Sequence, residues 1–141
     1  MNIKLLASLL FLIFTLTVNA QSPVGTWKSI DDQTGKARSH VKIVEKNGKL
    51  YGSITKLLES PEDSICDECP GDKKNQKVIG LEIIWDMEAY DDYWSYGKIL
   101  DPESGKIYKC NISLNGKDKL DVRGYIGFAA LGRTQTWHRV K

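Results

Sequence analysis

The sequence predicts an all-β protein in which eight strands form an up-and-down antiparallel barrel. Three observations predict this fold class. Turn signals recur at short and fairly regular intervals, the residues between them alternate between apolar and polar, and no stretch has the spacing of an amphipathic helix.

The N-terminal segment has the pattern of a secretory signal peptide. Lys4 provides a positive charge, an apolar run follows from Leu5 to Val18, and Val18-Asn19-Ala20 places small or medium-sized residues where a signal peptidase cleaves. We therefore expect a signal peptide over residues 1–20 and a single domain over 21–141. The protein should then be periplasmic or secreted, with no transmembrane segment after cleavage.

Four turn signals divide the rest of the sequence. The segments 31–36 and 101–106 share an outline in which aspartate starts the turn and glycine precedes a final lysine, whereas 47–49 and 115–117 both read Asn-Gly-Lys. Aspartate and asparagine favour turns because their side chains bond the local backbone, and glycine accepts the positive φ that tight reversals need.

The alternation between these turns predicts the strands. Tyr108, Cys110 and Ile112, for example, share one strand face, with Lys109 and Asn111 on the other. The predicted strands are residues 24–30, 37–46, 49–57, 79–86, 93–100, 106–114, 118–126 and 132–140. Tight turns join most of them into a meander, and closure into a barrel removes the exposed edges of a meander. A β-sandwich is the alternative. A sandwich normally needs longer crossing connections, and only segment 58–77 is long enough to supply one.

Residues near the ends of the domain indicate how the barrel closes. Gly25-Thr26-Trp27 opens the first predicted strand, and Trp137-His138-Arg139 lies in the last. A Gly-x-Trp on the first strand, with a basic residue of the last strand packed on the indole, resembles the signature of lipocalins and other calycins. The resemblance implies a lipocalin-like barrel with its first and last strands adjacent. The residues assigned to barrel closure are Gly25, Trp27, Arg133, Trp137 and Arg139.

The second half of the domain extends the resemblance. Asp101-Pro102 is followed by Gly105-Lys106 and Tyr108, and then come Leu120-x-Val122-Arg123-Gly124-Tyr125-x-Gly127 and Gly132-Arg133-Thr134-Gln135-Thr136-Trp137-x-Arg139. This order and spacing resemble domain-of-unknown-function family 2147, a group of small exported bacterial proteins. Membership implies a lipocalin-like barrel and export, but neither a ligand nor a reaction.

The cysteines must be interpreted for an oxidising compartment, where disulfides persist. Cys66 and Cys69 are predicted to form a disulfide that stiffens the long loop 58–77. A metal site, a redox-active dithiol and a pair of inert thiols are the alternatives for this spacing. Cys110 falls on an apolar strand face, which is typical of a buried and inert thiol.

No motif in the sequence predicts catalysis or a bound cofactor. A nucleophile elbow and a phosphate-binding loop are both missing, and His138 lies between Trp137 and Arg139, which favours a structural role. The formal net charge is only +2, of which Lys4 supplies one, so no basic surplus favours nucleic acid. We expect a protein that is not an enzyme and has no cofactor, no metal and no nucleic-acid partner.

Aromatic residues gather in the middle strands and suggest a ligand site in the barrel or at its mouth. An eight-stranded barrel holds either packed side chains or one small ligand. The candidate ligand-binding residues are Tyr51, Trp85, Trp94, Tyr96 and Tyr108. Arg123 is a candidate for binding an anionic head group, although pairing with a surface carboxylate or stacking on tryptophan is an equal alternative.

The sequence therefore predicts a protein that binds a small apolar or amphipathic molecule in the cell envelope. The first alternative is a structural or interaction protein with a filled barrel, whose 58–77 loop docks an envelope protein. The second is a thiol-redox or metal protein that uses Cys66 and Cys69.

Overall fold

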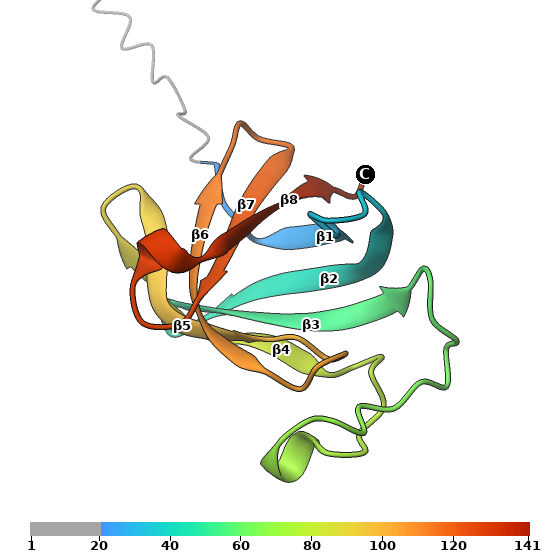
Figure 1. The fold of residues 1–141 in the computed structure, drawn as a ribbon. Coiled ribbons are helices and arrows are strands. Elements are labelled where there is room, and N and C mark those ends of the chain that lie inside the picture. The colour runs from blue at the N-terminus through green and yellow to red at the C-terminus, as the bar shows by residue number, and fades with distance from the viewer. Residues whose placement is uncertain (1–20) are drawn as a thin grey trace, which may run out of the picture.

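Eight antiparallel strands, paired in chain order, close into a barrel (Figure 1). The computed structural model describes residues 21–141, so the predicted signal peptide at 1–20 lies outside the described residues. The strands are β1 (Gly25–Ile30), β2 (Ala37–Lys46), β3 (Lys49–Leu57), β4 (Glu82–Tyr90), β5 (Tyr93–Leu100), β6 (Ile107–Leu114), β7 (Lys119–Tyr125) and β8 (Arg133–Arg139). The predicted all-β class and the closed up-and-down topology are confirmed.

Helical structure is limited to two single-turn 3-10 helices within the described residues, η1 (Gly71–Lys73) and η2 (Ala129–Leu131). η1 lies in the long loop between β3 and β4, and η2 lies in the loop between β7 and β8. Over residues 21–141, no helix is long and apolar enough to cross a membrane.

Strand β4 differs most from its predicted range, since it runs to Tyr90 rather than ending at residue 86. Tyr90 pairs directly with Tyr93, so Asp91 and Asp92 form a two-residue hairpin loop, with Asp91 at a φ of 53°. The register against β3 shifts between Leu50 and residue 52, and Asp86 has a φ of 56°. This bulge breaks the apolar–polar alternation, which is why the sequence pattern ended the strand too early.

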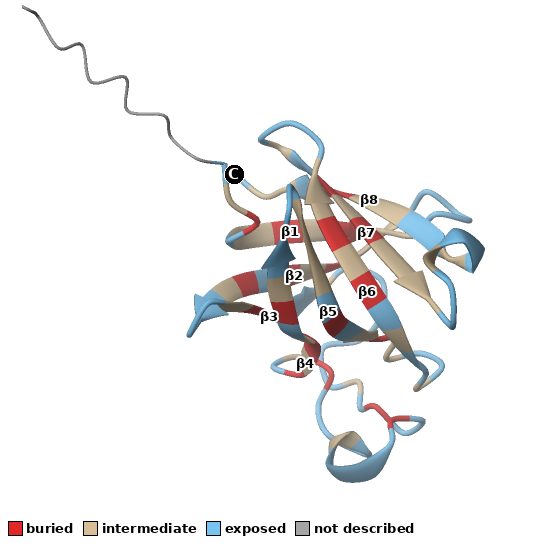
Figure 2. Cartoon of the chain, turned by 90° about the vertical axis from the view of Figure 1, so that its left-hand side faces the viewer, coloured by how far each residue is buried: buried red, intermediate tan, exposed pale blue. Residues whose placement is uncertain are grey.

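The inward-facing side chains fill the closed half of the barrel with an apolar core. Alternating strand positions are buried, and they appear as separate red bands along the strands in Figure 2. Each large side chain removed from water stabilises the fold by about 1.5–3 kcal/mol before its entropy cost. The largest fully buried side chains include Trp27, Ile43, Leu50, Ile84, Met87, Leu100, Ile112 and Leu120.

The barrel closes through a short ladder between β1 and β8, which pair at Trp27 with Arg139 and at Lys28 with His138. Side chains supplement this ladder. The Arg139 guanidinium lies 4.2 Å from the centroid of the fully buried Trp27 ring, and the Trp27 indole N–H donates to the Pro23 carbonyl at 2.8 Å. A Cβ at Gly25 would lie 2.6 Å from Arg139 Nη1, so only glycine leaves room for the stacked guanidinium.

Arg139 also ties the chain ends to the hairpin between β6 and β7. Its Nε donates to the Lys117 carbonyl at 2.8 Å, Nη1 donates to the Val24 carbonyl at 3.1 Å, and Nη2 donates to the Ser22 carbonyl at 3.0 Å. Three backbone carbonyls, two from residues 22–24 and one from the β6–β7 hairpin, therefore meet on one guanidinium at this end of the barrel.

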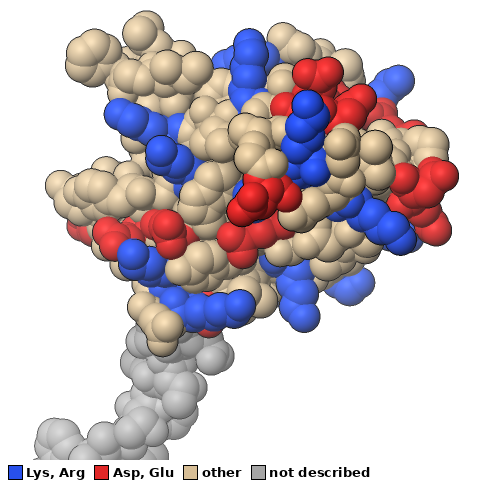
Figure 3. Space-filling view, turned by 90° about the horizontal axis from the view of Figure 1, so that it is seen from below, with Lys and Arg blue, Asp and Glu red and all other residues tan. Residues whose placement is uncertain are grey.

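Charged side chains are interspersed over the face of the molecule that Figure 3 shows. Lysine and arginine lie beside aspartate and glutamate there, and neither sign covers a broad area. This face therefore offers no continuous basic surface of the kind that binds a phosphate backbone.

Replacing Arg139 with alanine should lower the free energy of unfolding by about 2–3 kcal/mol, because it removes a cation–π contact and charged hydrogen bonds together. Urea denaturation followed by tryptophan fluorescence measures the loss. Lys141→Ala is the control, since its pair with Asp118 is exposed and should be worth under about 0.5 kcal/mol. Equal losses in the two variants would contradict this account of barrel closure.

Candidate functional site

A cavity of about 670 Å³ opens at the end of the barrel opposite Arg139. The loops β1–β2, β3–β4, β5–β6 and β7–β8 surround its mouth, and all four contribute lining residues. Small-molecule sites in proteins commonly measure about 300–1,000 Å³, so this cavity has the size of a site for one small ligand.

The deeper walls of the cavity are apolar. Ile54 from β3, Leu100 from β5, Val122 from β7 and Trp137 from β8 face inward, and each is at most 3% exposed. Gly124 leaves additional space, since a Cβ there would lie in ordinary contact with the Tyr108 side chain, at 3.4 Å. Such walls favour a ligand with an apolar body.

Two serines provide the polar groups of the interior. Ser29 of β1 and Ser39 of β2 are each 7% exposed and are the only buried polar residues among those described. Their hydroxyl oxygens lie 2.8 Å apart, and the Ser39 backbone N–H donates to Ser29 Oγ at 3.1 Å. When Ser29 donates to Ser39 Oγ, the Ser39 hydroxyl proton is left to donate to a ligand in the cavity.

The two Asp-to-Lys turns predicted from the sequence form matching parts of the mouth. In each, the first aspartate N–H donates to the lysine carbonyl at 2.9 Å, and the glycine N–H donates to the aspartate carbonyl at 2.8 Å. Asp31 Oδ1 accepts from the backbone of Gln33 and Thr34, and the Thr34 and Gln33 bonds lower the pKa of that carboxyl. The turns therefore hold Asp31 as a carboxylate.

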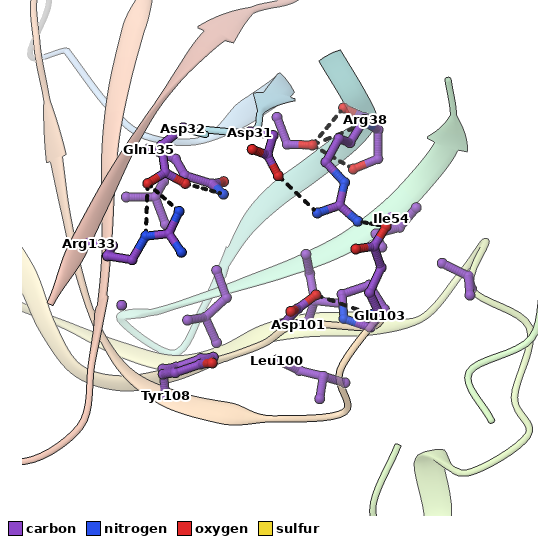
Figure 4. Close-up of a pocket in the computed structure, with 18 of the residues that line it drawn as sticks. Asp31, Asp32, Arg38, Ile54, Leu100, Asp101, Glu103, Tyr108, Arg133 and Gln135 are labelled. Carbon is purple, nitrogen blue, oxygen red and sulfur yellow. Dashed lines mark hydrogen bonds and ion pairs between the residues drawn. The ribbon is translucent and has the colours of Figure 1, made fainter. Parts of the chain in front are cut away.

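Arg38 links the two turns across the mouth. Its Nη1 lies 3.5 Å from Asp31 Oδ2 in the first turn, and its Nη2 pairs with Glu103 in the second (Figure 4). The guanidinium therefore spans the β1–β2 and β5–β6 loops and is neutralised by both.

A second chain of polar contacts runs from the interior to the mouth. The Trp137 indole N–H donates to Gln135 Oε1 at 2.9 Å, and Gln135 Nε2 donates to Asp32 Oδ1 at 3.4 Å. Asp32 Oδ2 accepts from Arg133 Nε at 3.0 Å and from Nη2 at 2.7 Å (Figure 4). The hydrogen bond with Asp32 raises the pKa of Arg133. Arg133, which the sequence analysis assigned to barrel closure, lies instead at the cavity mouth.

The 58–77 segment lies beside the mouth and packs on the β5–β6 turn. Cys66 and Cys69 form the disulfide that the sequence predicts, and both residues are buried. Cys66 Sγ lies 3.3 Å from the Pro102 carbonyl oxygen. Gly105, at a φ of 70°, packs so closely on Glu68 that any Cβ would overlap the Glu68 carbonyl. The disulfide loop is therefore fixed to the turn.

Among the six candidate ligand-binding residues, Tyr108 lines the cavity. Trp94 packs half-buried against the core instead. The Tyr51 hydroxyl donates to Asp86 Oδ1 at 3.0 Å. The Lys73 ammonium lies over the Trp85 ring, 5.0 Å from the ring centroid. These three aromatic side chains lie in the barrel wall, apart from the cavity lining.

Tyr96 and Arg123 also lie apart from the cavity lining. Tyr96 has a φ of 64° next to a register shift in β5, is 65% exposed, and meets Tyr90 edge-on with 5.7 Å between the ring centroids. Arg123 Nε donates to the Ala129 carbonyl at 2.7 Å, and Nη1 donates to Thr134 Oγ1 at 2.8 Å. Arg123 therefore holds the β7–β8 loop.

The polar residues of the cavity were not predicted from the sequence. Ser29 follows Trp27 by two positions and Ser39 precedes Val41 by two, so the alternation already placed both serines on inward faces. The link from Gln135 to Asp32 carried no such signal, because their contact joins β8 to the β1–β2 loop, far apart in the sequence.

The third cysteine and the histidines do not extend the site. Cys110 is fully buried, and burial raises the pKa of its thiol to about 12. Burial also lowers the pKa of His40, with further lowering by Lys56 and Lys28. Over the described part of the chain, no group of three or more His, Cys, Asp and Glu side chains could hold a metal ion.

Fold and cavity together define a lipocalin-like barrel. The chain belongs to the family described as an uncharacterized protein conserved in bacteria, DUF2147, whose profile matches residues 25–139. A similar solved structure is described as "Protein HP1028 from the human pathogen Helicobacter pylori belongs to the lipocalin family", with 21% sequence identity and a TM-score of 0.75. The similarity covers 85% of this chain and 84% of that one and shows a shared fold. No curated protein matches the chain significantly.

Gly105→Ala should destabilise the protein more than Gly35→Ala, although both glycines occupy the same position in matching turns. Their φ values are 70° and 71°, so both variants carry about 1 kcal/mol of backbone strain. Only Gly105 touches the 58–77 segment, and we expect a total loss of at least about 2 kcal/mol there, with faster proteolysis of that segment. Urea denaturation and limited proteolysis measure both effects, and equal losses would contradict the docking of the loop.

Cys110 should resist alkylation in the folded protein at neutral and mildly alkaline pH, because the raised pKa keeps its thiol protonated. Mass spectrometry after iodoacetamide treatment, with and without urea, measures this protection. Burial of the neutral thiol stabilises the folded state below pH 9.0. This contribution to the free energy of unfolding should be lost as the pH rises from 9.0 towards about 12, because the unfolded chain releases the thiol proton first. Rapid labelling without denaturant would contradict the burial of Cys110.

Proposed function

We propose that this protein binds one small apolar or amphipathic molecule in the barrel cavity and does not transform it chemically. The observation that carries the proposal is a cavity of about 670 Å³ whose deeper walls are apolar and whose mouth is open. A barrel that served only as a scaffold would be expected to fill this volume with side chains, since voids lower stability.

The polar groups of the site favour a ligand with an uncharged polar end. Arg38 and Arg133 are both paired with carboxylates at the mouth, and Arg123 is bonded to the β7–β8 loop. None of the three guanidinium groups is thus left free for an anionic head group, so the role considered for Arg123 is not carried forward. The Ser29–Ser39 hydroxyl pair offers a hydrogen bond to a ligand hydroxyl or carbonyl.

We also propose that binding takes place in the cell envelope or outside the cell. Two observations support this location. Residues 1–20 have the sequence pattern of a signal peptide, and the Cys66–Cys69 disulfide is of a kind that persists in oxidising compartments.

The alternatives raised by the sequence receive less support. A redox-active cysteine pair needs an accessible thiol, whereas Cys66 is fully buried and Cys69 is 2% exposed. A structural protein with a filled barrel is disfavoured by the open cavity.

Filling the cavity with one larger side chain should weaken binding strongly and leave the fold intact. Gly124→Leu directs its side chain between Tyr108 and Ile99, and we expect an affinity loss of about tenfold or more for the apolar fluorophore phenylnaphthylamine. Ser113→Leu is the matched control, because it adds the same side chain on the outer face of β6, opposite Asp121. Fluorescence titration measures both affinities.

Native mass spectrometry of the protein purified from its source then tests whether a ligand is carried in the cavity. A co-purifying small molecule that is lost from Gly124→Leu and kept by Ser113→Leu is the expected result. The proposal fails if the wild type carries no molecule and phenylnaphthylamine binds all three proteins equally.

A further inference from the structure

The loop between β7 and β8 presents an apolar tip beside the cavity mouth. Its residues 126–131 read Ile-Gly-Phe-Ala-Ala-Leu and contain no charged or hydrogen-bonding side chain. Ile126, Phe128 and Leu131 are 68%, 78% and 76% exposed, which are the highest values of any large apolar side chain among the described residues. Single exposed apolar residues are common on soluble proteins, but three on one short loop indicate an interaction site.

The tip is held in place by the residues around it. Arg123 donates to the Ala129 carbonyl at 2.7 Å, the Leu131 N–H donates to the Phe128 carbonyl at 3.0 Å, and a Cβ at Gly132 would lie 2.5 Å from the Gly124 carbonyl oxygen. The loop therefore packs its backbone against β7 and leaves the side chains of Ile126, Phe128 and Leu131 largely exposed.

Each of the two mouth loops next to the tip contains one exposed lysine. In the closed barrel the neighbouring mouth loops are β1–β2 and β5–β6, which end in the exposed residues Lys36 and Lys106. In these loops Asp32 pairs with Arg133 and Glu103 pairs with Arg38, whereas Asp101 accepts from the Glu103 N–H and the Ser104 hydroxyl of its own turn. Neither lysine takes part in an ion pair within the described chain.

The acidic part of the mouth lies on the opposite side of the barrel. The β3–β4 loop is two mouth loops away from the β7–β8 loop in either direction, and Figure 1 shows η1 and η2 on opposite sides of the molecule. The acidic residues of the β3–β4 loop are Glu59, Glu62, Asp63, Asp67, Glu68 and Asp72. The same loop also contains Lys73, Lys74 and Lys77, so acidic residues outnumber basic ones by six to three there. The apolar tip therefore lies across the mouth from its most acidic loop.

We propose that the 126–131 tip docks the protein onto a phospholipid bilayer that contains anionic headgroups. A protruding, charge-free loop inserts its side chains among acyl chains, and the flanking lysines meet lipid phosphates, as interfacial anchors do. Ile126 and Leu131 also line the cavity, so docking turns the open mouth towards the membrane. A bilayer dissolves apolar molecules, so docking brings the cavity mouth to a source of apolar ligand. Only this statement about the ligand rests on the proposed function.

Vesicle sedimentation tests the docking directly, with phosphatidylcholine vesicles that contain or lack phosphatidylglycerol. The triple variant Ile126→Ser/Phe128→Ser/Leu131→Ser should lose about tenfold or more of the vesicle affinity. Lys36→Gln/Lys106→Gln should lose about fivefold per lysine, only on vesicles with phosphatidylglycerol. Tyr90→Ser/Tyr96→Ser is the matched control, since it removes exposed aromatic rings elsewhere and should bind as the wild type does.

A second variant tests docking independently of whether the triple variant folds. Phe128→Trp should show a blue shift of its added emission when vesicles are mixed in, whereas Tyr96→Trp should show none. Unchanged sedimentation of the triple variant, or no shift for Phe128→Trp, would overturn the proposal. A wild type that self-associates through this loop and ignores vesicles would overturn it in favour of a second copy of the chain. Phenylnaphthylamine binding by Phe128→Ser, which changes the one large apolar residue of the tip outside the cavity lining, separates failure of docking from failure of the cavity.

Discussion

The contact between Trp27 and Arg139 is the constraint on which the rest of the structure depends. β1 and β8 share two register pairs, whereas β1 and β2 share six, so backbone pairing alone joins β1 to β8 only weakly. The boundary between β1 and β8 is the seam of the barrel. The stacked guanidinium and its three bonds to carbonyl oxygens supply what the ladder lacks. If this seam opened, the sheet would have two free edges and the cavity would lose a wall.

The cavity follows from the difference between the two ends of a closed barrel. Short hairpins and Arg139 cover one end, whereas the other carries the longer loops. The two arginines at that end are both paired with carboxylates of the loops, Arg38 with Glu103 and Arg133 with Asp32. The interior is left apolar except for one hydroxyl pair, which agrees with the proposed binding of a small apolar or amphipathic molecule.

Local patterns made the fold predictable, and long-range contacts made most of the site unpredictable. The turns at 31–36 and 101–106 and the Cys66–Cys69 disulfide follow from neighbouring residues, and all were found from the sequence. The bulge at Asp86 interrupts the alternation, so the end of β4 was misplaced. Tyr96 was proposed as a cavity residue, but its positive φ lies at a second register shift that turns it outward. No sequence pattern indicates which end of a strand borders an open cavity. Of the aromatic residues proposed as ligand-binding, only Tyr108 lines the cavity.

The seam between β1 and β8 and the cavity mouth lie at opposite ends of the barrel, so barrel closure and cavity shape depend on different residues. Substitutions around Trp27 act on whether the barrel forms at all, whereas substitutions in the four mouth loops can reshape the recess without touching that seam. A change in the mouth loops can therefore alter the shape of the cavity while β1 and β8 stay joined, so a shared fold does not imply a shared function.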